Sequence, residues 1–340
     1  MLIGIIFVII FLSILILVHE LGHFLTAKKF GLLVEEFGFG LPPRIFRKKI
    51  GETTYSINAL PFGGFVKIYG EDNLEAGAVR ERSFISLKIW QRAIILFAGV
   101  FFNFILGWMV ISLVFAIGTS PAVVITEVIK NSPAAEIGLM AGDKLEGENL
   151  TTKSVIDFIN EHRGQKIDLK IERSGKIIDF VATPRLNPPE GEGALGIGLV
   201  DTGLPKKSIL ASFWEGLKTS LEMIKIIALA IMNLIGKAFL GKASLEQVTG
   251  PIGIVKITAQ AGSLGLVYLL HLLALISLNL AVINILPFPA LDGGRLFFLM
   301  IEKIKGSPIN PKIEKVANAF GFALLIFLMV IITIKDIIRL

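Results

Sequence analysis

Four long apolar stretches limit what this chain can fold into. Each is close to the ~20 residues that an α-helix needs to cross the hydrocarbon core of a bilayer. They lie at about residues 2–25, 93–117, 264–286 and 316–334. Hydrophobic residues make up 53% of the 340-residue chain, which is high for a soluble domain. We therefore predict an α-helical polytopic membrane protein with four transmembrane helices.

A fifth apolar stretch, residues 217–241, follows a different pattern. Its polar side chains recur at spacings of three, four or eight residues and so form one stripe on a helix: Lys218, Glu222, Lys225, Asn233 and Lys237. One polar stripe on an apolar helix is typical of a helix that lies in the membrane interface. A fifth span would also reverse the direction of the span that follows it. We therefore predict an interfacial amphipathic helix here.

The charged residues predict the orientation. Four lysines lie between the last two apolar stretches: Lys303, Lys305, Lys312 and Lys315. Short loops rich in Lys and Arg stay in the cytoplasm, so we place this loop and residues 26–92 inside and residues 118–204 outside. The same bias explains the net charge of +6. Because the chain has no nucleic-acid-binding motif, we predict no nucleic-acid partner.

Residues 118–204 have the size of a small domain. Within them, Ile167, Leu169 and Ile171 alternate with polar residues, which predicts a half-buried strand, and residues 152–162 predict a helix. The domain therefore has an α/β pattern. We divide the chain into a first membrane part, an external domain, an interfacial helix with its connection, and a second membrane part, at residues 1–117, 118–204, 205–262 and 263–340.

A metal-binding pattern ends the first apolar stretch. The sequence His19-Glu20-Leu21-Gly22-His23 places two histidines four residues apart, so on a helix both imidazoles can bind one metal ion. Glu20 is then placed to act as general base and acid toward a water molecule. The alternative is an unrelated pair of histidines. Ionisable groups beside a membrane span are costly and usually functional, which favours the metal site.

Asp292 is the best candidate for a third ligand. The chain has no cysteine, so zinc would be bound through histidine and carboxylate. Asp292 follows a span that runs inward, and Pro287 and Pro289 before it interrupt a regular helix. Irregular backbone at membrane depth lines a wet cavity or is buried in protein. The alternative is a plain turn, because Asp-Gly-Gly is common in turns.

These two motifs together resemble the site-2 protease family of intramembrane zinc metalloproteases. The match lies in His19–His23 and the distant Leu291-Asp292-Gly293, and it is closest to the bacterial, regulator of sigma-E protease-like branch. The resemblance implies one Zn2+ per chain, bound by His19, His23 and Asp292, with Glu20 as the catalytic residue. It also implies regulated intramembrane proteolysis of single-span membrane proteins, either anti-sigma factors or remnant signal peptides, in the bacterial inner (plasma) membrane.

Other segments resemble the substrate-binding parts of that family. Asn103, in Gly99–Asn103, and Asn284 resemble polar residues near the zinc, although helix–helix hydrogen bonding is an alternative. Residues 55–69 resemble a membrane-associated β-hairpin whose edge could add an extended substrate strand. The alternative for this hairpin is a purely structural re-entrant element. The predicted substrate-binding residues are Asn103, Asn284, Pro287, Gly63 and Gly64.

The external domain resembles a PDZ domain. Residues 131–143 are similar to the corresponding stretch in the PDZ domains of bacterial proteases. We therefore predict one inserted, external PDZ-like α/β domain, whereas well-studied members of the branch carry two. It either binds a peptide end or excludes bulky substrates, and exclusion is slightly favoured.

Two other functions compete with proteolysis. A non-catalytic membrane adaptor would bind partner tails through the PDZ-like domain and use zinc structurally. Such a site would not need Glu20 and usually closes all four metal positions. A metal transporter is the third alternative, and the absence of an inverted repeat of motifs in the sequence ranks it last.

Overall fold

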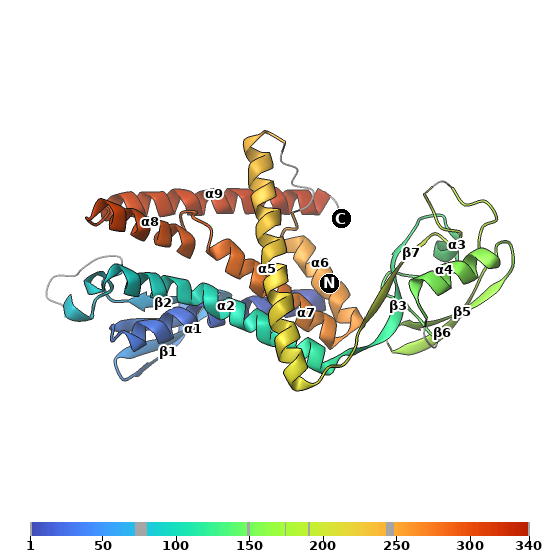
Figure 1. Ribbon diagram of the computed structural model, residues 1–340, viewed down its shortest axis with the longest axis horizontal. Coiled ribbons are helices and arrows are strands. Elements are labelled where there is room, and N and C mark those ends of the chain that lie inside the picture. The colour runs from blue at the N-terminus through green and yellow to red at the C-terminus, as the bar shows by residue number, and fades with distance from the viewer. Residues whose placement is uncertain are drawn as a thin grey trace. The chain divides into compact units, whose positions relative to one another are not determined.

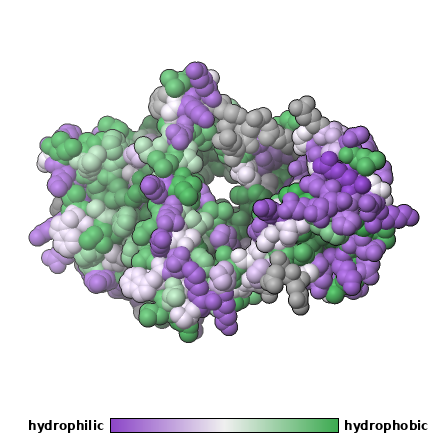
Figure 2. Space-filling view, turned by 45° about the vertical axis from the view of Figure 1, so that its right-hand side comes forward, coloured by the Kyte–Doolittle hydropathy of each residue, from purple (hydrophilic) through white to green (hydrophobic). Residues whose placement is uncertain are grey.

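The computed structural model describes residues 2–71, 80–147, 150–173, 175–189, 191–242 and 248–338. The chain divides into a mostly helical unit and a unit built on a five-stranded sheet (Figure 1). Apolar side chains gather over the helices, whereas the sheet unit has a largely polar surface (Figure 2). The main helices are α1 (Leu2–Lys29), α2 (Ile89–Ile117), α5 (Ile209–Phe239), α6 (Pro251–Leu264), α7 (Leu266–Asn284), α8 (Asp292–Lys305) and α9 (Pro311–Ile338).

Five helices in the described residues are long and apolar enough to cross a membrane. Four of them, α1, α2, α7 and α9, coincide with the four apolar stretches and confirm that these are helices. The fifth is α5, where the sequence predicted an interfacial helix. Length and composition alone therefore do not distinguish four spans from five.

In the helical unit, α2 packs against both α1 and α7. Where α1 meets α2, a side chain at Gly22 would lie 2.8 Å from the carbonyl carbon of Ala98. Where α2 meets α7, Ser277 Oγ donates a buried hydrogen bond of 2.7 Å to the carbonyl oxygen of Asn103. Small residues at such crossings allow close backbone approach, which is how helices associate in membranes. Three helices far apart in the sequence are thus fixed side by side.

A two-stranded sheet lies between α1 and α2 in the sequence. Its strands, β1 (Val34–Ile50) and β2 (Thr53–Ile68), extend well beyond the predicted hairpin at residues 55–69. Phe37 pairs with both Tyr55 and Val66, so the long strands bend and the sheet folds back on itself. Residues 64–68 pair with 34–39 on one side, and no further strand pairs with them in the described part of the chain. This segment is therefore an edge.

A shared apolar cluster joins this sheet to the helices. Its buried members come from α1, from both strands, from α2 and from α8, and they include Ala27, Val34, Ile68, Ile95 and Leu299. Fully burying one such aliphatic side chain contributes about 1.5–3 kcal/mol. The cluster therefore fixes the relative positions of the elements that carry the predicted site residues.

The second unit is an antiparallel sheet with its own core. Its strands are β3 (Thr119–Val128), β4 (Lys144–Leu145), β5 (Ile167–Arg173), β6 (Lys176–Ala182) and β7 (Ile197–Leu204), in the order β6-β5-β4-β3-β7. In β5, Ile167, Leu169 and Ile171 are buried and alternate with exposed residues, which confirms the predicted strand. The predicted helix is also confirmed, as α4 (Thr152–Glu161), and the short α3 (Pro133–Glu136) precedes it.

Candidate metal centre and active site

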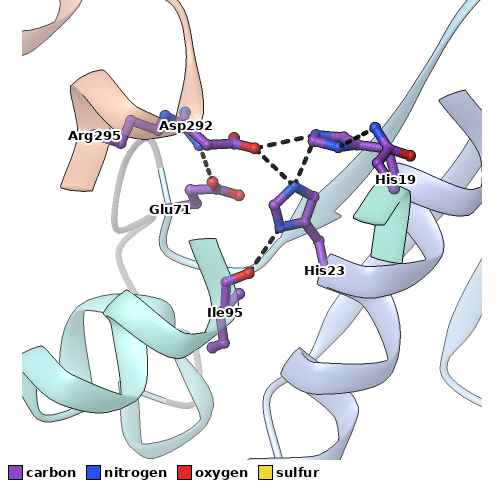
Figure 3. Close-up of polar contacts among 7 residues, drawn as sticks. His19, His23, Glu71, Ile95, Asp292 and Arg295 are labelled. Atoms are coloured by element: carbon purple, nitrogen blue, oxygen red, sulfur yellow. Dashed lines mark hydrogen bonds and ion pairs between the residues drawn. The ribbon is translucent and has the colours of Figure 1, made fainter. Parts of the chain in front are cut away.

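Three predicted ligands come together although Asp292 is far from the histidines in sequence. Asp292 Oδ2 lies 3.1 Å from His19 Nε2 and 3.4 Å from His23 Nε2, and the two Nε2 atoms are 3.2 Å apart (Figure 3). The histidines project from one face of α1, as their spacing predicted. Asp292 is the first residue of α8. Two helices thus supply a triangle of three donor atoms.

The dimensions of this triangle fit zinc. Zinc is usually tetrahedral, with bonds of ~2.0–2.1 Å to nitrogen and oxygen, which separates its ligand atoms by roughly 3.3 Å. The three observed separations lie within a few tenths of an ångström of that value. Asp292 Oδ2 is also buried and accepts no hydrogen bond among the described residues. A buried carboxylate oxygen is costly without a partner, and a cation bound by these three atoms would provide one.

The backbone of α2 fixes the orientation of His23. Its Nδ1 lies 2.8 Å from the carbonyl oxygen of Ile95, in a buried contact (Figure 3). A carbonyl oxygen only accepts, so Nδ1 carries the proton and donates it. Nε2 of the neutral ring then presents a lone pair toward Asp292 and His19. Metal-binding histidines usually have such a second partner, which selects the ligating tautomer.

Asn103 plays the same part for His19. Its side-chain Nδ2 lies 3.3 Å from His19 Nδ1, only 1% of the residue is exposed, and its Oδ1 is buried without a hydrogen-bond partner among the described residues. The same amide turned by 180° would place Oδ1 at this position, where it accepts the Nδ1 proton and leaves Nε2 for a metal. The sequence predicted Asn103 as a substrate contact. In the structure its side chain lies beside His19 Nδ1, where it can orient the imidazole ring.

Local backbone packing delivers Asp292 to this position. Residues 285–291 form an irregular loop in which Phe288 N donates to the carbonyl oxygen of Leu286 over 2.7 Å. Side chains at Gly293 and Gly294 would come well under 3.0 Å from the backbone of this loop, so only glycine allows α8 to begin there. Asp292 also lies at the positive end of the helix dipole, which favours a carboxylate.

A cavity of about 580 Å³ opens beside the three ligands. It is lined by His19, Glu20, His23 and Asp292 on one side and by residues 65–71 at the end of β2 on another. Glu20 adjoins the first histidine but does not belong to the ligand triangle. A side chain at Gly64 would lie 3.2 Å from Glu20 Cγ, so this glycine leaves the glutamate accessible. The cavity therefore offers a carboxylate next to a metal site.

One ion pair of this cavity was not predicted from the sequence. Arg295, three residues after Asp292 on α8, pairs with Glu71 just beyond β2 (Figure 3). Both residues line the cavity. A second pair, between Arg92 of α2 and Glu302 of α8, holds the other end of the same helix. Neither pair has a recognisable spacing in the sequence, because each joins segments more than 200 residues apart.

The remaining predicted site residues lie at different places. Asn284 ends α7 and is half-buried, and Pro287 is exposed in the loop that precedes Asp292. Gly63 has a positive φ of 123°, which favours glycine, and it adjoins Leu41 of β1. Gly64 is the predicted substrate residue at which an added side chain would lie 3.2 Å from Glu20 Cγ.

Comparisons with known proteins agree with this chemistry. The model for "Peptidase family M50" matches residues 7–328. CPE1693 of Clostridium perfringens is 37% identical over 98% of this chain and 98% of its own length. Zinc metalloprotease RasP of Shouchella clausii is 31% identical over 96% and 97%. Regulator of sigma-W protease RasP of Bacillus subtilis is 30% identical over 98% of both chains.

Proposed function

The chain belongs to peptidase family M50, and on that premise we propose that it cuts single-span membrane proteins, such as anti-sigma factors or remnant signal peptides. It is an intramembrane zinc metalloprotease. The observation that carries the proposal is the triangle of His19 Nε2, His23 Nε2 and Asp292 Oδ2 beside the carboxylate of Glu20. Two relatives are named as regulators of sigma factors, which supports anti-sigma factors as substrates.

Each residue at the site then has a separate task. His19, His23 and Asp292 would hold zinc, and Ile95 and Asn103 orient the two imidazoles from behind. Zinc, when bound, polarises the scissile carbonyl and activates water at neutral pH. Glu20 takes a proton from the attacking water and delivers it to the leaving amide nitrogen. Such proton transfer contributes about 10²–10⁴-fold to the rate.

The edge of β2 supports a way to hold the substrate. Residues 65–69 line the cavity, and this edge takes no further strand in the part of the chain that the structure describes. A substrate helix must unwind before its amide can react, and an extended segment can then pair with a free strand edge. Gly64 keeps the approach to Glu20 open, and its neighbour Gly63 is proposed as a further substrate contact. Asn284 and Pro287 border the loop of Asp292 and are proposed as further substrate contacts.

We propose four transmembrane spans, with α5 in the membrane interface. Its buried residues Ser212, Gly216 and Ser220 lie on one face, and the charged residues Lys218, Glu222 and Lys225 are exposed on the opposite face. In a span, these charges would face hydrocarbon at a high cost. In Figure 1, α5 also runs across the direction that α1, α2 and α9 share.

The position of Asp292 also favours four spans. Since Ile95 near the start of α2 accepts a hydrogen bond from His23, α2 begins on the side of the metal centre. If α5 crossed the bilayer, α7 would end on the far side, whereas Asp292 lies 3.1 Å from His19. The 14-residue α6 cannot restore the direction, because it is only ~21 Å long against a core of ~30 Å.

The remaining details of topology are proposals of the same kind. Lys303 and Lys305 end α8, and Lys312 and Lys315 begin α9, so this connection is placed in the cytoplasm. The sheet unit then lies outside the bacterial plasma membrane. We propose that it is a single PDZ-like domain that keeps bulky proteins from the site until they have been shortened. Its five-stranded antiparallel sheet with α4 supports this proposal.

The decisive test measures zinc content and cleavage with purified protein in detergent. The substrates are a single-span anti-sigma factor and a signal peptide, and the variants are Glu20→Gln and Asp292→Ala. We expect the wild type to bind one zinc and cut at least one substrate. Glu20→Gln should keep zinc and lose at least about 100-fold in rate. Asp292→Ala should lose zinc, and Glu222→Gln on the exposed face of α5 is the matched control.

Two results would contradict the proposal. The first is cleavage by Glu20→Gln at the wild-type rate, which would remove Glu20 from the reaction. The second is tight zinc binding by a wild type that cuts neither substrate. In that case the enzyme would act on a different class of protein.

A further inference from the structure

The turn just before Asp292 contains an unusual backbone conformation. Ala290 has a φ of 77°, in the left-handed region that residues with a side chain rarely adopt. Such a conformation costs free energy and persists only where its surroundings fix it. Leu291 alone separates Ala290 from Asp292. The direction of the Asp292 side chain therefore depends on what holds this turn.

A side chain of α9 contacts the turn directly. The N–H of Ala290 donates a hydrogen bond of 3.0 Å to Asn318 Oδ1, which lies 28 residues further along the chain. Asn318 is half-buried in the second turn of α9. Ala290 is exposed, so the effect of this bond lies in the conformation that it holds, because a residue with a side chain keeps a positive φ only where its surroundings fix it.

A second contact brings α9 against the same turn. Gly321, one helical turn after Asn318, is buried, and a side chain there would lie 2.8 Å from the carbonyl carbon of Pro289 and closer to its oxygen. Backbone therefore lies directly on backbone at this point. The loop is fixed on its other side by Gly293 and Gly294 of α8. Residues 289–291 are thus held between two helices.

We propose that Asn318 is a positioning residue for the metal centre. By accepting the Ala290 N–H it holds the turn in its left-handed conformation and directs Asp292 toward His19 and His23. Asn318 does not line the 580 Å³ cavity that holds the ligands and Glu20. It lines a second cavity, of about 710 Å³, so it acts on the metal through the backbone of residues 290–292. Replacing a group behind a ligand typically lowers metal affinity by about 10–100-fold.

This inference rests on the metal centre and is independent of the substrate. The test therefore measures metal binding and uses no cleavage assay. Asn318→Leu removes the acceptor at similar volume, and Asn318→Asp retains it. Asn310→Leu is the matched control, because Asn310 is the same residue type beside the same helix, but its side-chain Oδ1 accepts from Lys312 N at the start of α9 and not from the turn before Asp292. Zinc release to a chelator, the absorption spectrum of the cobalt-substituted protein, and thermal unfolding are measured for each.

We expect Asn318→Leu to release zinc at least about tenfold faster than the wild type and to alter the cobalt spectrum. Asn318→Asp and Asn310→Leu should behave like the wild type in both measurements. The proposal is overturned if Asn318→Leu keeps wild-type zinc release and spectrum. It is also overturned if Asn310→Leu releases zinc equally fast. A lower unfolding temperature of Asn318→Leu with an unchanged cobalt spectrum would assign Asn318 a structural role only, and would overturn it too.

Discussion

The two units of the molecule provide opposite surroundings for a buried carboxylate oxygen. In the sheet unit, Asp143 is 1% exposed and both of its oxygens are used: Oδ1 and Oδ2 accept from Arg173, and Oδ2 also accepts from Met140 N. In the helical unit, Asp292 Oδ2 accepts no hydrogen bond among the described residues and faces two imidazole nitrogens. A buried polar group with all its hydrogen-bond partners stabilises a fold, whereas one that lacks a partner can bind a ligand.

The two aspartates also differ in how far along the sequence their neighbours lie. Asp143 borders a core whose members all come from residues 123–195. The position of Asp292 depends on contacts with α1, α2 and α9. These helices come together only when the whole helical unit has folded. The sheet unit is therefore expected to be a local folding unit, and the metal centre a property of long-range packing.

The largest effect is expected where a side chain would enter the metal centre. A methyl group at Gly99 of α2 would lie 2.7 Å from His19 Cε1 and nearer still to His23 Nε2. Gly99→Val should displace both imidazoles and lower zinc affinity by roughly 100-fold, as measured by competition with a chelator. Gly236→Ala is the control, since nothing lies within 4 Å of that position on α5. Unchanged zinc affinity in Gly99→Val would mean that the histidines are not constrained by α2.

A smaller effect is expected for the satisfied aspartate. Asp143→Ala removes the ion pair with Arg173 and the acceptor for Met140 N, and should lower the free energy of unfolding of the sheet unit by about 3 kcal/mol. Zinc affinity should not change. Chemical denaturation of the full chain, followed by hydrogen exchange in β5, measures the first effect. Asp168→Ala, on the exposed face of β5, is the control.

A parallel loss of zinc in Asp143→Ala would break the comparison. It would show that the two units unfold together and that the metal centre depends on the sheet. If Asp168→Ala lowered the free energy of unfolding equally, the loss of a charge in the sheet unit would explain the effect and the burial of Asp143 would not.

The smallest effect concerns an exposed carboxylate that lies outside the five candidate spans. The Arg82 guanidinium, and after it Lys28, lower the pKa of Glu52 from the usual 4.5 to about 2. The lowered pKa means that the pairs stabilise the fold fully above pH ~4.5, and that this contribution is lost as the pH falls toward ~2. Glu52 is exposed, so salt should weaken the effect.

The corresponding measurement compares the denaturation midpoints of wild type and Glu52→Gln across this pH range. We expect a small difference at pH 7 that shrinks at high salt and vanishes near pH 2. Glu81→Gln removes the same charge near by and provides the control. A difference that grows as the pH falls would reverse the assigned sign of the pKa shift.

Local patterns in the sequence predicted the parts of the molecule that depend on local geometry. The periodicity of one helix or strand explains the spacing of His19 and His23 and the alternation in β5. The lengths of the apolar stretches predicted α1, α2, α7 and α9. The prolines Pro287 and Pro289 also indicated that the preceding helix would end before Asp292, and α7 ends at Asn284. The resemblance to a family added the pairing of the two distant motifs.

The contacts that orient the ligands could not be predicted in this way. The carbonyl oxygen of Ile95 leaves no trace in the sequence, because every residue has one. The pair Arg295–Glu71 and the bond from Ala290 to Asn318 join segments whose closeness follows from helix packing alone. The sequence predicted Asn103 as a substrate contact, and its buried position beside His19 could be seen only in the fold. The positive φ of Ala290 could not be predicted, because such a conformation is usually indicated by a glycine and this position holds alanine.

The separation of the ligands along the chain has a consequence for synthesis in the cell. His19 and His23 leave the ribosome early, whereas Asp292 is made more than 260 residues later. At ~5–20 residues per second, the histidines wait roughly 15–55 seconds for their third partner. A chain that is still being threaded into the membrane therefore lacks one of the three candidate ligands. The candidate metal centre is complete only after Asp292 and the helices that hold it have been made.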